Sequence, residues 1–267
     1  MTAHPFLRDL RPTLHIAHRG GAGLAPENTM AAFRAAVEQY ATDMIELDVH
    51  ATRDGEIVVA HDETLERCTD GEGPIAERSF AEIERLDAGY RFTPDGVTFP
   101  FRGLGLRIPR LSEVLARFAV RLNVEIKPRT PGPEALLAEI LRRAGAVERV
   151  CVGSADDEVA ARMVAALPEA CHFYPTRALT EVHHAIGSGV ASGDSPFLVL
   201  DMPLVLGDVR LLDERLMAWA RGAGRWINVW TIDDADEMRR LVAQGVGGIM
   251  TDRPDRLREV LGAVSSA

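Results

Sequence analysis

Residues 14–33, LHIAHRGGAGLAPENTMAAF, and residues 44–62, MIELDVHATRDGEIVVAHD, decide the fold of this chain. Leu14–His18 and Met44–His50 are short apolar runs, as expected for buried strands. Between them the apolar spacing is helical, with Asn28 or Thr29 able to cap a helix that runs to Tyr40. The pair of segments therefore predicts a strand–helix–strand unit, from which parallel sheets are built.

The same alternation continues along the chain. Glu56–Ala60 follows the turn at Asp54–Gly55 and is predicted to be an extra strand, in a hairpin with the second strand. Apart from this hairpin strand, eight strands are predicted: Leu14–His18, Met44–His50, Leu122–Lys127, Arg149–Gly153, His172–Pro175, Phe197–Asp201, Trp226–Thr231 and Gly248–Thr251. Later helices are predicted at Glu134–Ala144, Asp156–Ala166, Thr180–Ser188, Asp208–Arg221, Asp234–Gln244 and Pro254–Val264, and a short helix starts at Ser112 and Glu113.

Eight such repeats favour an α/β protein of the (β/α)8 TIM-barrel class, which commonly takes about 250 residues as one domain. An open, doubly wound sheet is the alternative. The first strand is not followed by a GxGxxG fingerprint, because Gly20-Gly21-Ala22-Gly23 lacks that spacing, so dinucleotide binding has little support.

One long connection interrupts the alternation. Residues 62–109 exceed the usual length of a strand-to-helix loop, and such an excess is often functional. Its second half is rich in Phe, Gly and Pro. We expect one domain over residues 1–267, in which residues 62–108 are an insertion that caps one mouth of the barrel.

Composition limits the classes of partner. The chain has 267 residues and a formal net charge of −10, which argues against a nucleic-acid binder. An acidic protein that binds an anionic ligand needs local cations or a metal at the binding site. Three cysteines without CxxC spacing suggest buried thiols. No signal peptide and no apolar run of about 18 residues is recognisable, so we expect a cytoplasmic protein without stable membrane insertion.

Carboxylates alternate along two of the predicted strands. Glu46, Asp48 and His50 share one face of MIELDVH, and Glu125 and Lys127 share one face of NVEIK. Charged side chains inside a barrel are reasonable at its C-terminal mouth, where barrel active sites lie. Three carboxylates from two strands offer all-oxygen ligation, which suits Mg²⁺ or Ca²⁺ better than zinc. The competing interpretation is structural ion pairing with Lys127 and Arg19.

Two histidines end apolar runs on either side of these carboxylates. His18 precedes Arg19, and His61 precedes Asp62. Together they suggest a general acid and a general base. Arg19 and Lys127 would supply the local cations that phosphate requires.

Three further residues lie near this cluster in the predicted fold. Trp230 ends the seventh strand and is a candidate apolar wall of the pocket. Glu27 is a candidate to orient a neighbouring group, with loop capping as the alternative. His50 is expected at a solvated strand end, with a role as a ligand or as support for a ligand as the alternative.

The order of short motifs resembles the glycerophosphodiester phosphodiesterase family over nearly the whole chain. The resemblance rests on His18-Arg19-Gly20, Pro26-Glu27-Asn28-Thr29, Glu46-x-Asp48, Asp54-Gly55, His61-Asp62, Arg67-Cys68-Thr69, Leu86-Asp87-Ala88-Gly89, Pro109-x-Leu111, Glu125-Ile126-Lys127, Val229-Trp230-Thr231 and Gly248-Ile249-Met250-Thr251-Asp252. That family is a (β/α)8 barrel with an insertion after its second strand.

The resemblance implies metal-dependent hydrolysis of glycerophosphodiesters to glycerol 3-phosphate and an alcohol. The metal ligands would be Glu46, Asp48 and Glu125, and the acid–base pair would be His18 and His61. Arg19 and Lys127 match phosphate-contacting cations.

Three other functions remain open from the sequence. The first is a related barrel phosphodiesterase for lysophospholipids or cyclic and inositol phosphodiesters, with Phe92, Phe99, Phe101 and Leu104 lining an acyl channel. The second is a metal-dependent sugar isomerase or aldolase, which has no obvious use for Arg19 and two histidines. The third is a non-catalytic binding protein, although no histidine or carboxylate of the pattern is missing. The alcohol, the physiological metal and the oligomeric state are left open.

Overall fold

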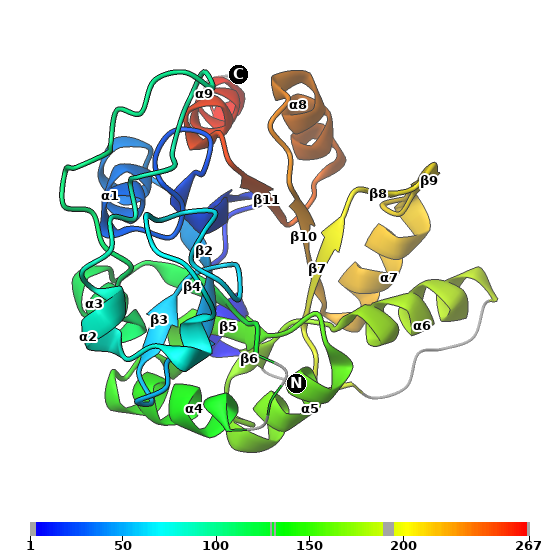
Figure 1. Cartoon of the computed structure of the whole chain (residues 1–267). Helices are drawn as coiled ribbons and strands as arrows, with labels where there is room; N and C mark the ends of the chain where they lie inside the picture. Colours follow the sequence, from blue (N-terminus) through cyan, green and yellow to red (C-terminus); the bar gives the residue numbers. More distant parts are fainter. Residues whose placement is uncertain (1–3, 129, 131, 189–194, 266–267) are drawn as a thin grey trace.

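Eight parallel strands form a barrel in the computed structural model of the chain, which describes residues 4–128, 130, 132–188 and 195–265 (Figure 1). Seven ladders join them in one continuous order, β6-β5-β4-β2-β1-β11-β10-β7. Their bounds are β1 Leu14–Ala17, β2 Met44–Ala51, β4 Arg121–Ile126, β5 Val150–Gly153, β6 Cys171–His172, β7 Val199–Pro203, β10 Trp226–Trp230 and β11 Gly248–Thr251. Each corresponds to one predicted strand, with ends that differ by at most three residues, and β11 has the predicted bounds.

The barrel closes between β6 and β7, where the strands are short. Phe173 and Val199 form an isolated parallel bridge. The amide of Tyr174 donates to the carbonyl of Val199 at 2.9 Å, and the amide of Leu198 donates to the carbonyl of His172 at 2.8 Å. This closure confirms the predicted (β/α)8 barrel and excludes the open sheet.

Helices cover the outside of the barrel, as Figure 1 shows. The capping residues are those that the sequence suggested: the side chains of Thr29, Asp156 and Asp234 accept hydrogen bonds from first-turn amides. The helices are α1 Met30–Arg34, continued by a π-helical turn at Ala35–Gln39, α3 Leu111–Arg117, α4 Pro133–Arg143, α5 Asp157–Ala166, α6 Thr176–Gly187, α7 Glu214–Ala223, α8 Ala235–Gln244 and α9 Pro254–Ser265. Short 3-10 turns lie at Pro5–Leu7, His18–Gly20, Ile75–Glu77 and Val147–Arg149.

Two of the predicted helix starts were wrong. The helix predicted from Asp208 begins at Glu214, because Asp213 is the residue whose side chain caps it. The residues before it form a small hairpin of β8 (Val205–Leu206) and β9 (Val209–Arg210), which turns at Gly207 with φ of +59°. The helix predicted from Thr180 begins one turn earlier, at Thr176.

The insertion begins on a hairpin. β3 (Ile57–Val59) pairs antiparallel with β2, as predicted, and α2 (Phe80–Ile83) follows. The segment has a small hydrophobic cluster, made of Val58, Leu65, Ile75, Phe80, Ile83, Ala88 and Ile108. It therefore has an anchored base, from which its loops extend along one side of the barrel in Figure 1.

The barrel interior changes from apolar to charged along its axis. Phe6, Leu14 and Met44 belong to a buried apolar cluster that includes the starts of β1 and β2. Further along, the Asn123 amide donates to Asp201 Oδ2 at 2.6 Å, joining the non-adjacent strands β4 and β7. The carboxylates of β2 and β4 follow. The fold thus places polar groups toward the C-terminal mouth, as barrel active sites require.

Candidate functional site

Three carboxylates meet where β2 and β4 end. Asp48 lies directly opposite Glu125 in the parallel ladder, and Glu46 lies two residues earlier on the same face of β2. One oxygen atom from each of the three carboxylates lies within 4.8 Å of the others. Asp48 is only 1% exposed and Glu46 only 7%. The sequence-predicted ligand set is therefore assembled in space.

Carboxylates clustered this closely repel one another, so the cluster favours a nearby cation. Burial, and then the charge of Asp48, raise the pKa of Glu46 to about 8. The ammonium Nζ of Lys127 lies 3.0 Å from Asp48 Oδ1 and 2.9 Å from Glu125 Oε2, so it compensates part of this charge. An all-oxygen set of three carboxylates fits Mg²⁺ or Ca²⁺ better than zinc.

Arg19 is held beside this cluster by a tight turn. Its backbone has φ of +50°, and its amide donates to Glu46 Oε2 at 2.9 Å. Its Nη1 donates to Glu27 Oε1 at 2.9 Å, while its Nε lies 3.5 Å from Asp48 Oδ2 and has no hydrogen-bond partner among the described residues. A side chain on Gly20 would meet the Phe33 ring at 2.7 Å, so only glycine allows this turn to pack on α1.

Each of the two histidines is held by a carboxylate. His18 Nδ1 lies 2.7 Å from Asp252 Oδ1, and His61 Nδ1 lies 2.7 Å from Asp62 Oδ1. Because an ionised carboxylate only accepts, each Nδ1 is assigned the proton, and each Nε2 is left for chemistry. Burial lowers the pKa of His18, but the hydrogen bond to Asp252 and the charge of Glu46 outweigh burial and raise it.

A family model confirms the resemblance seen in the motifs. The model of the glycerophosphoryl diester phosphodiesterase family matches residues 18–256. The chain belongs to this family.

Individual relatives match over the same length. A glycerophosphodiester phosphodiesterase from Caldanaerobacter subterraneus subsp. tengcongensis is 35% identical, covering 92% of this chain and 96% of that protein. A lysophospholipase D from Homo sapiens is 27% identical, covering 92% of this chain and 86% of that protein. The solved structure of an Oleispira antarctica phosphodiesterase in complex with the product sn-glycerol-3-phosphate is 26% identical, with a TM-score of 0.71 and coverage of 92% and 96%.

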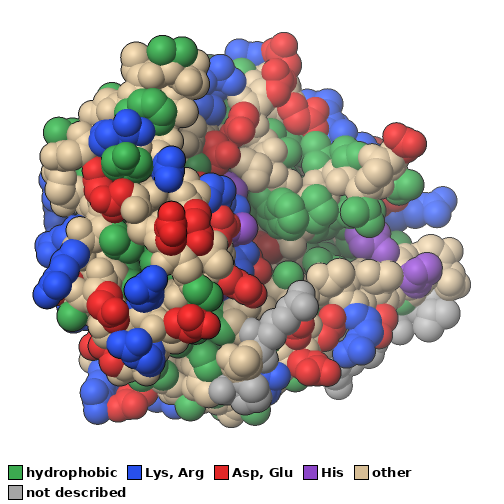
Figure 2. Space-filling model, viewed as in Figure 1, with side chains coloured by type: hydrophobic (Ala, Val, Ile, Leu, Met, Phe, Trp, Pro, Cys, Tyr) green, Lys and Arg blue, Asp and Glu red, His purple; other side chains and the backbone are tan. Residues whose placement is uncertain are grey.

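In this member of the glycerophosphodiester phosphodiesterase family, the wall of the barrel mouth opposite the carboxylate cluster is apolar. Trp230, 41% exposed, ends β10 beside Pro203 of β7. The β8–β9 hairpin that follows β7 exposes Val205, Leu206 and Val209. Figure 2 shows a central hollow with charged side chains and histidine on one wall and hydrophobic side chains on the other. The mouth therefore offers different chemistry on its two sides.

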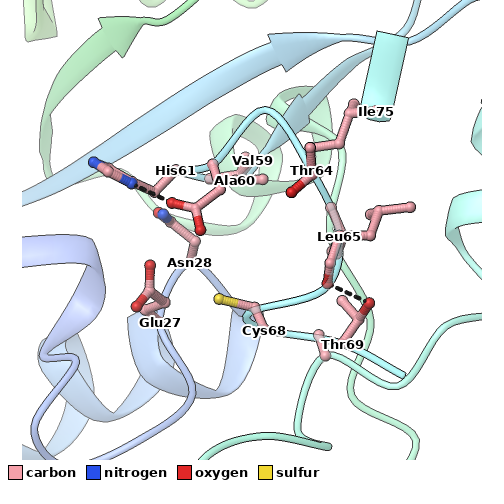
Figure 3. Close-up of a pocket in the computed structure, with 13 residues that line it drawn as sticks. Glu27, Asn28, Val59, Ala60, His61, Thr64, Leu65, Cys68, Thr69 and Ile75 are labelled. Carbon is pink, nitrogen blue, oxygen red and sulfur yellow. Dashed lines mark hydrogen bonds and ion pairs between the residues drawn. The ribbon is translucent and has the colours of Figure 1, made fainter. Parts of the chain in front are cut away.

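The aromatic residues of the insertion do not line the pocket beside His61. Phe92 and Phe101 pack edge to face with ring centroids 5.2 Å apart, and the Arg102 guanidinium stacks on Phe99. The pocket beside His61 is instead lined by Glu27, Asn28, Cys68, Leu65 and smaller apolar residues (Figure 3). None of the aromatic residues named for an acyl channel is among its lining residues.

His50 differs from the sequence expectation. It was expected at a solvated strand end, but it is 5% exposed, and its Nε2 lies 3.1 Å from the carbonyl oxygen of His61. Because β3 folds back on β2, His50 is covered and fixes the backbone of His61. His172, for which no role was predicted, is buried with its two ring nitrogens 3.1 and 2.9 Å from the carbonyl oxygens of Val152 and Leu167, which is a structural environment.

Sequence reasoning gave no role to the carboxylates that hold the histidines. Asp62 and Asp252 appear in the quoted motifs, but nothing in their spacing pairs them with His61 and His18. Asp62 follows its histidine directly in the sequence, which is a signal that could have been used. Asp252 is 234 residues from His18, so only the neighbouring positions of β1 and β11 bring the two together.

Proposed function

We propose that this family member hydrolyses glycerophosphodiesters to glycerol 3-phosphate and an alcohol. The observation that carries the proposal is the pair of carboxylate-held imidazoles beside three clustered carboxylates and two cations. Membership of the family and the activities named for its relatives support the same reaction.

In this proposal Arg19 and Lys127 bind the phosphate group. Arg19 Nε, which has no hydrogen-bond partner among the described residues, and the Lys127 ammonium can both donate to non-bridging phosphate oxygens. Glu27 keeps the Arg19 guanidinium near the cluster, so little reorganisation is required when a phosphodiester enters.

His18 and His61 act as the acid–base pair. One Nε2 removes a proton from the nucleophile, and the other imidazole, protonated, donates its proton to the leaving alcohol oxygen. The nucleophile is either water or the glycerol 2-hydroxyl. Asp252 and Asp62 keep the two rings in the orientation and tautomer that this requires.

Glu46, Asp48 and Glu125 would hold the divalent metal, which we propose to be Mg²⁺ or Ca²⁺. When bound, such a cation supplies positive charge that offsets the charge developing on the phosphate oxygens. The raised pKa of Glu46 fits this role, because a cation favours its ionised form.

We propose that the chain forms a single barrel domain. Within it, residues 62–108 form a cap, and this cap selects the alcohol part of the substrate. We also propose a cytoplasmic location. No helix among the described residues is both long and apolar enough for a membrane span. Fractionation of cells that express the tagged chain checks the location.

The metal role provides the direct test. Activity on glycerophosphocholine is measured after exhaustive EDTA treatment and again after addition of Mg²⁺, Ca²⁺ or other divalent ions. We expect loss and then recovery in wild type, and no recovery in Glu125→Gln. Full activity after chelation would rule out the proposed metal role.

Lysophospholipids are the second candidate substrates. The exposed apolar wall of Trp230, Val205, Leu206 and Val209 favours them, and one relative is a lysophospholipase D. Comparison of kcat/KM for glycerophosphocholine and a monomeric short-chain lysophosphatidylcholine separates the two substrates.

A further inference from the structure

We infer that Arg67 is a positioning residue that holds the side chains of the acid–base histidine His61 and of the phosphate-binding Arg19 in place. The inference rests on the proposed function for the roles of these two groups. Arg67 belongs to a motif, Arg67-Cys68-Thr69, to which the proposed mechanism assigns no task. Its side chain lies between two carboxylates, and each of them contacts one of the proposed reacting groups.

The first carboxylate is Asp62. Arg67 Nε donates to Asp62 Oδ2 at 2.5 Å, and Arg67 Nη2 donates to Asp62 Oδ1 at 3.0 Å. The same Oδ1 lies 2.7 Å from His61 Nδ1. The bidentate bond fixes the plane of the carboxylate, and the carboxylate in turn fixes the imidazole. The hydrogen bonds from Arg67 are also the main reason that the pKa of Asp62 is lowered to about 2.

The second carboxylate is Glu27. Arg67 Nη1 donates to Glu27 Oε2 at 2.7 Å, and Arg67 Nη2 donates to Glu27 Oε1 at 2.8 Å. Glu27 Oε1 also accepts from Arg19 Nη1 at 2.9 Å. Glu27 is therefore shared between two guanidinium groups. Without Arg67 its charge would be balanced by Arg19 alone, and we expect Arg19 to be drawn away from the phosphate.

The backbone presents Arg67 in this position. It lies in a turn closed by two bonds to the Leu65 carbonyl, from the Thr69 amide at 3.0 Å and from the Thr69 hydroxyl at 2.7 Å. Leu65 and Thr69 are 2% and 1% exposed, so both ends of the turn are buried. The turn belongs to the insertion that begins after β3, whereas Glu27 belongs to the β1–α1 loop (Figure 3). Arg67 therefore joins two separate loops at the mouth.

Four directed hydrogen bonds occupy four of the five N–H groups of this guanidinium. This makes Arg67 a poor phosphate ligand and a good spacer between carboxylates. Lysine offers a point charge without the planar fork, so it cannot hold both carboxylates in these orientations.

Four variants test the inference: Arg67→Gln, Arg67→Lys, Arg67→Ala and, as a control, Arg78→Gln. Arg78 lies in the same insertion with similar exposure, and its nearest carboxylate is Glu82 at 4.0 Å. We expect kcat for glycerophosphocholine to fall about 10- to 100-fold in Arg67→Gln, with a smaller rise in KM because Arg19 is drawn away from the phosphate. Arg67→Lys should recover only part of the loss, and guanidinium ion added to Arg67→Ala should restore part of kcat. Arg78→Gln should match wild type.

Two readouts separate positioning from mere stability. The thermal midpoint of Arg67→Gln should stay close to that of Arg78→Gln. Loss of the Arg67 hydrogen bonds should raise the pKa of Asp62, which NMR titration of the Asp62 carboxyl in Arg67→Gln and Arg78→Gln measures directly. A kcat within about twofold of wild type, or a loss confined to KM, would overturn the inference.

Nitrogen NMR of the His61 side chain gives a test without substrate. The Nδ1–H tautomer should dominate in wild type and in Arg78→Gln, and its population should fall in Arg67→Gln. If wild type hydrolyses no glycerophosphodiester but the tautomer still depends on Arg67, the proposed function fails and the positioning role stands. If the tautomer is unchanged in Arg67→Gln, the positioning role fails whatever the activity.

Discussion

The two halves of the barrel mouth differ in chemistry. The half built from β1, β2 and β4 carries His18, Arg19 and the three carboxylates, and the hairpin strand β3 adds His61. The half built from β7 and β10 carries exposed Trp230 and the apolar β8–β9 hairpin. One side can therefore bind and activate a phosphodiester, while the other can contact the part of the substrate that is not phosphate. The barrel wall thus places the reacting groups and an apolar contact surface on different sides, in addition to the insertion proposed to select the alcohol.

Asp201 joins the two halves below the mouth. The amides of Asn123 on β4 and Asn228 on β10 donate to its two oxygens at 2.6 and 2.8 Å, and burial raises its pKa to about 6. Because both Asp201 oxygens accept hydrogen bonds, this layer links β4, β7 and β10 across the barrel interior.

The largest loss is expected on the charged half. His18→Ala and His61→Ala should each reduce kcat by about 10²–10⁴-fold, because each removes a proton-transfer group. Circular dichroism should report an intact fold. His184→Ala, on the exposed face of α6, is the control and should be fully active. Near-normal turnover in either site variant would contradict the assignment of the reacting groups to the charged half.

A smaller loss is expected when the support of His18 is weakened. Asp252→Asn should lower the pKa of His18, because the carboxylate that raises it is gone, and should reduce kcat by about 10- to 100-fold. A raised histidine pKa stabilises the fold at pH values below the ordinary pKa of 6.5, and this contribution is lost as the pH rises through the folded-state pKa. NMR titration of the metal-free protein checks the shift. The thermal difference between variant and wild type should be larger at pH 5.5 than at pH 9, and an unchanged His18 pKa would contradict this assignment.

On the apolar half the effect should appear in binding. Trp230→Ala should raise KM by about 5- to 10-fold and leave kcat within about twofold, because apolar contact is lost while the charged half is untouched. Steady-state kinetics on glycerophosphocholine measure both constants. A large fall in kcat at unchanged KM would place Trp230 with the reacting groups instead.

The smallest effect is expected at the hairpin. The double variant Leu206→Ser, Val209→Ser should change the free energy of unfolding by less than about 0.5 kcal/mol, because both side chains are exposed. Its activity on glycerophosphocholine should equal that of wild type. A rise in KM for a lysophospholipid alone would assign the hairpin to acyl-chain binding. Kinetics equal to those of wild type on both substrates would show that the hairpin takes no part in substrate recognition.

The charged half was predictable from the sequence, and the rest of the site less so. Glu46, Asp48 and Glu125 could be named because alternation along a strand fixes which side chains share a face. The eight-strand barrel followed from repeated strand–helix units. The Asp252–His18 contact and the Asp201 layer depend on register between strands distant in sequence, which alternation does not encode. The β8–β9 hairpin was missed because its two strands have only two residues each, too few for a periodic pattern.

The most direct test of the central claim is phosphorus and proton NMR of the products formed from glycerophosphocholine by the metal-loaded enzyme. The proposed mechanism predicts glycerol 3-phosphate, formed in equal amount to choline and absent after chelation. Phosphocholine with free glycerol, or the absence of turnover on every glycerophosphodiester with every divalent metal, would contradict it.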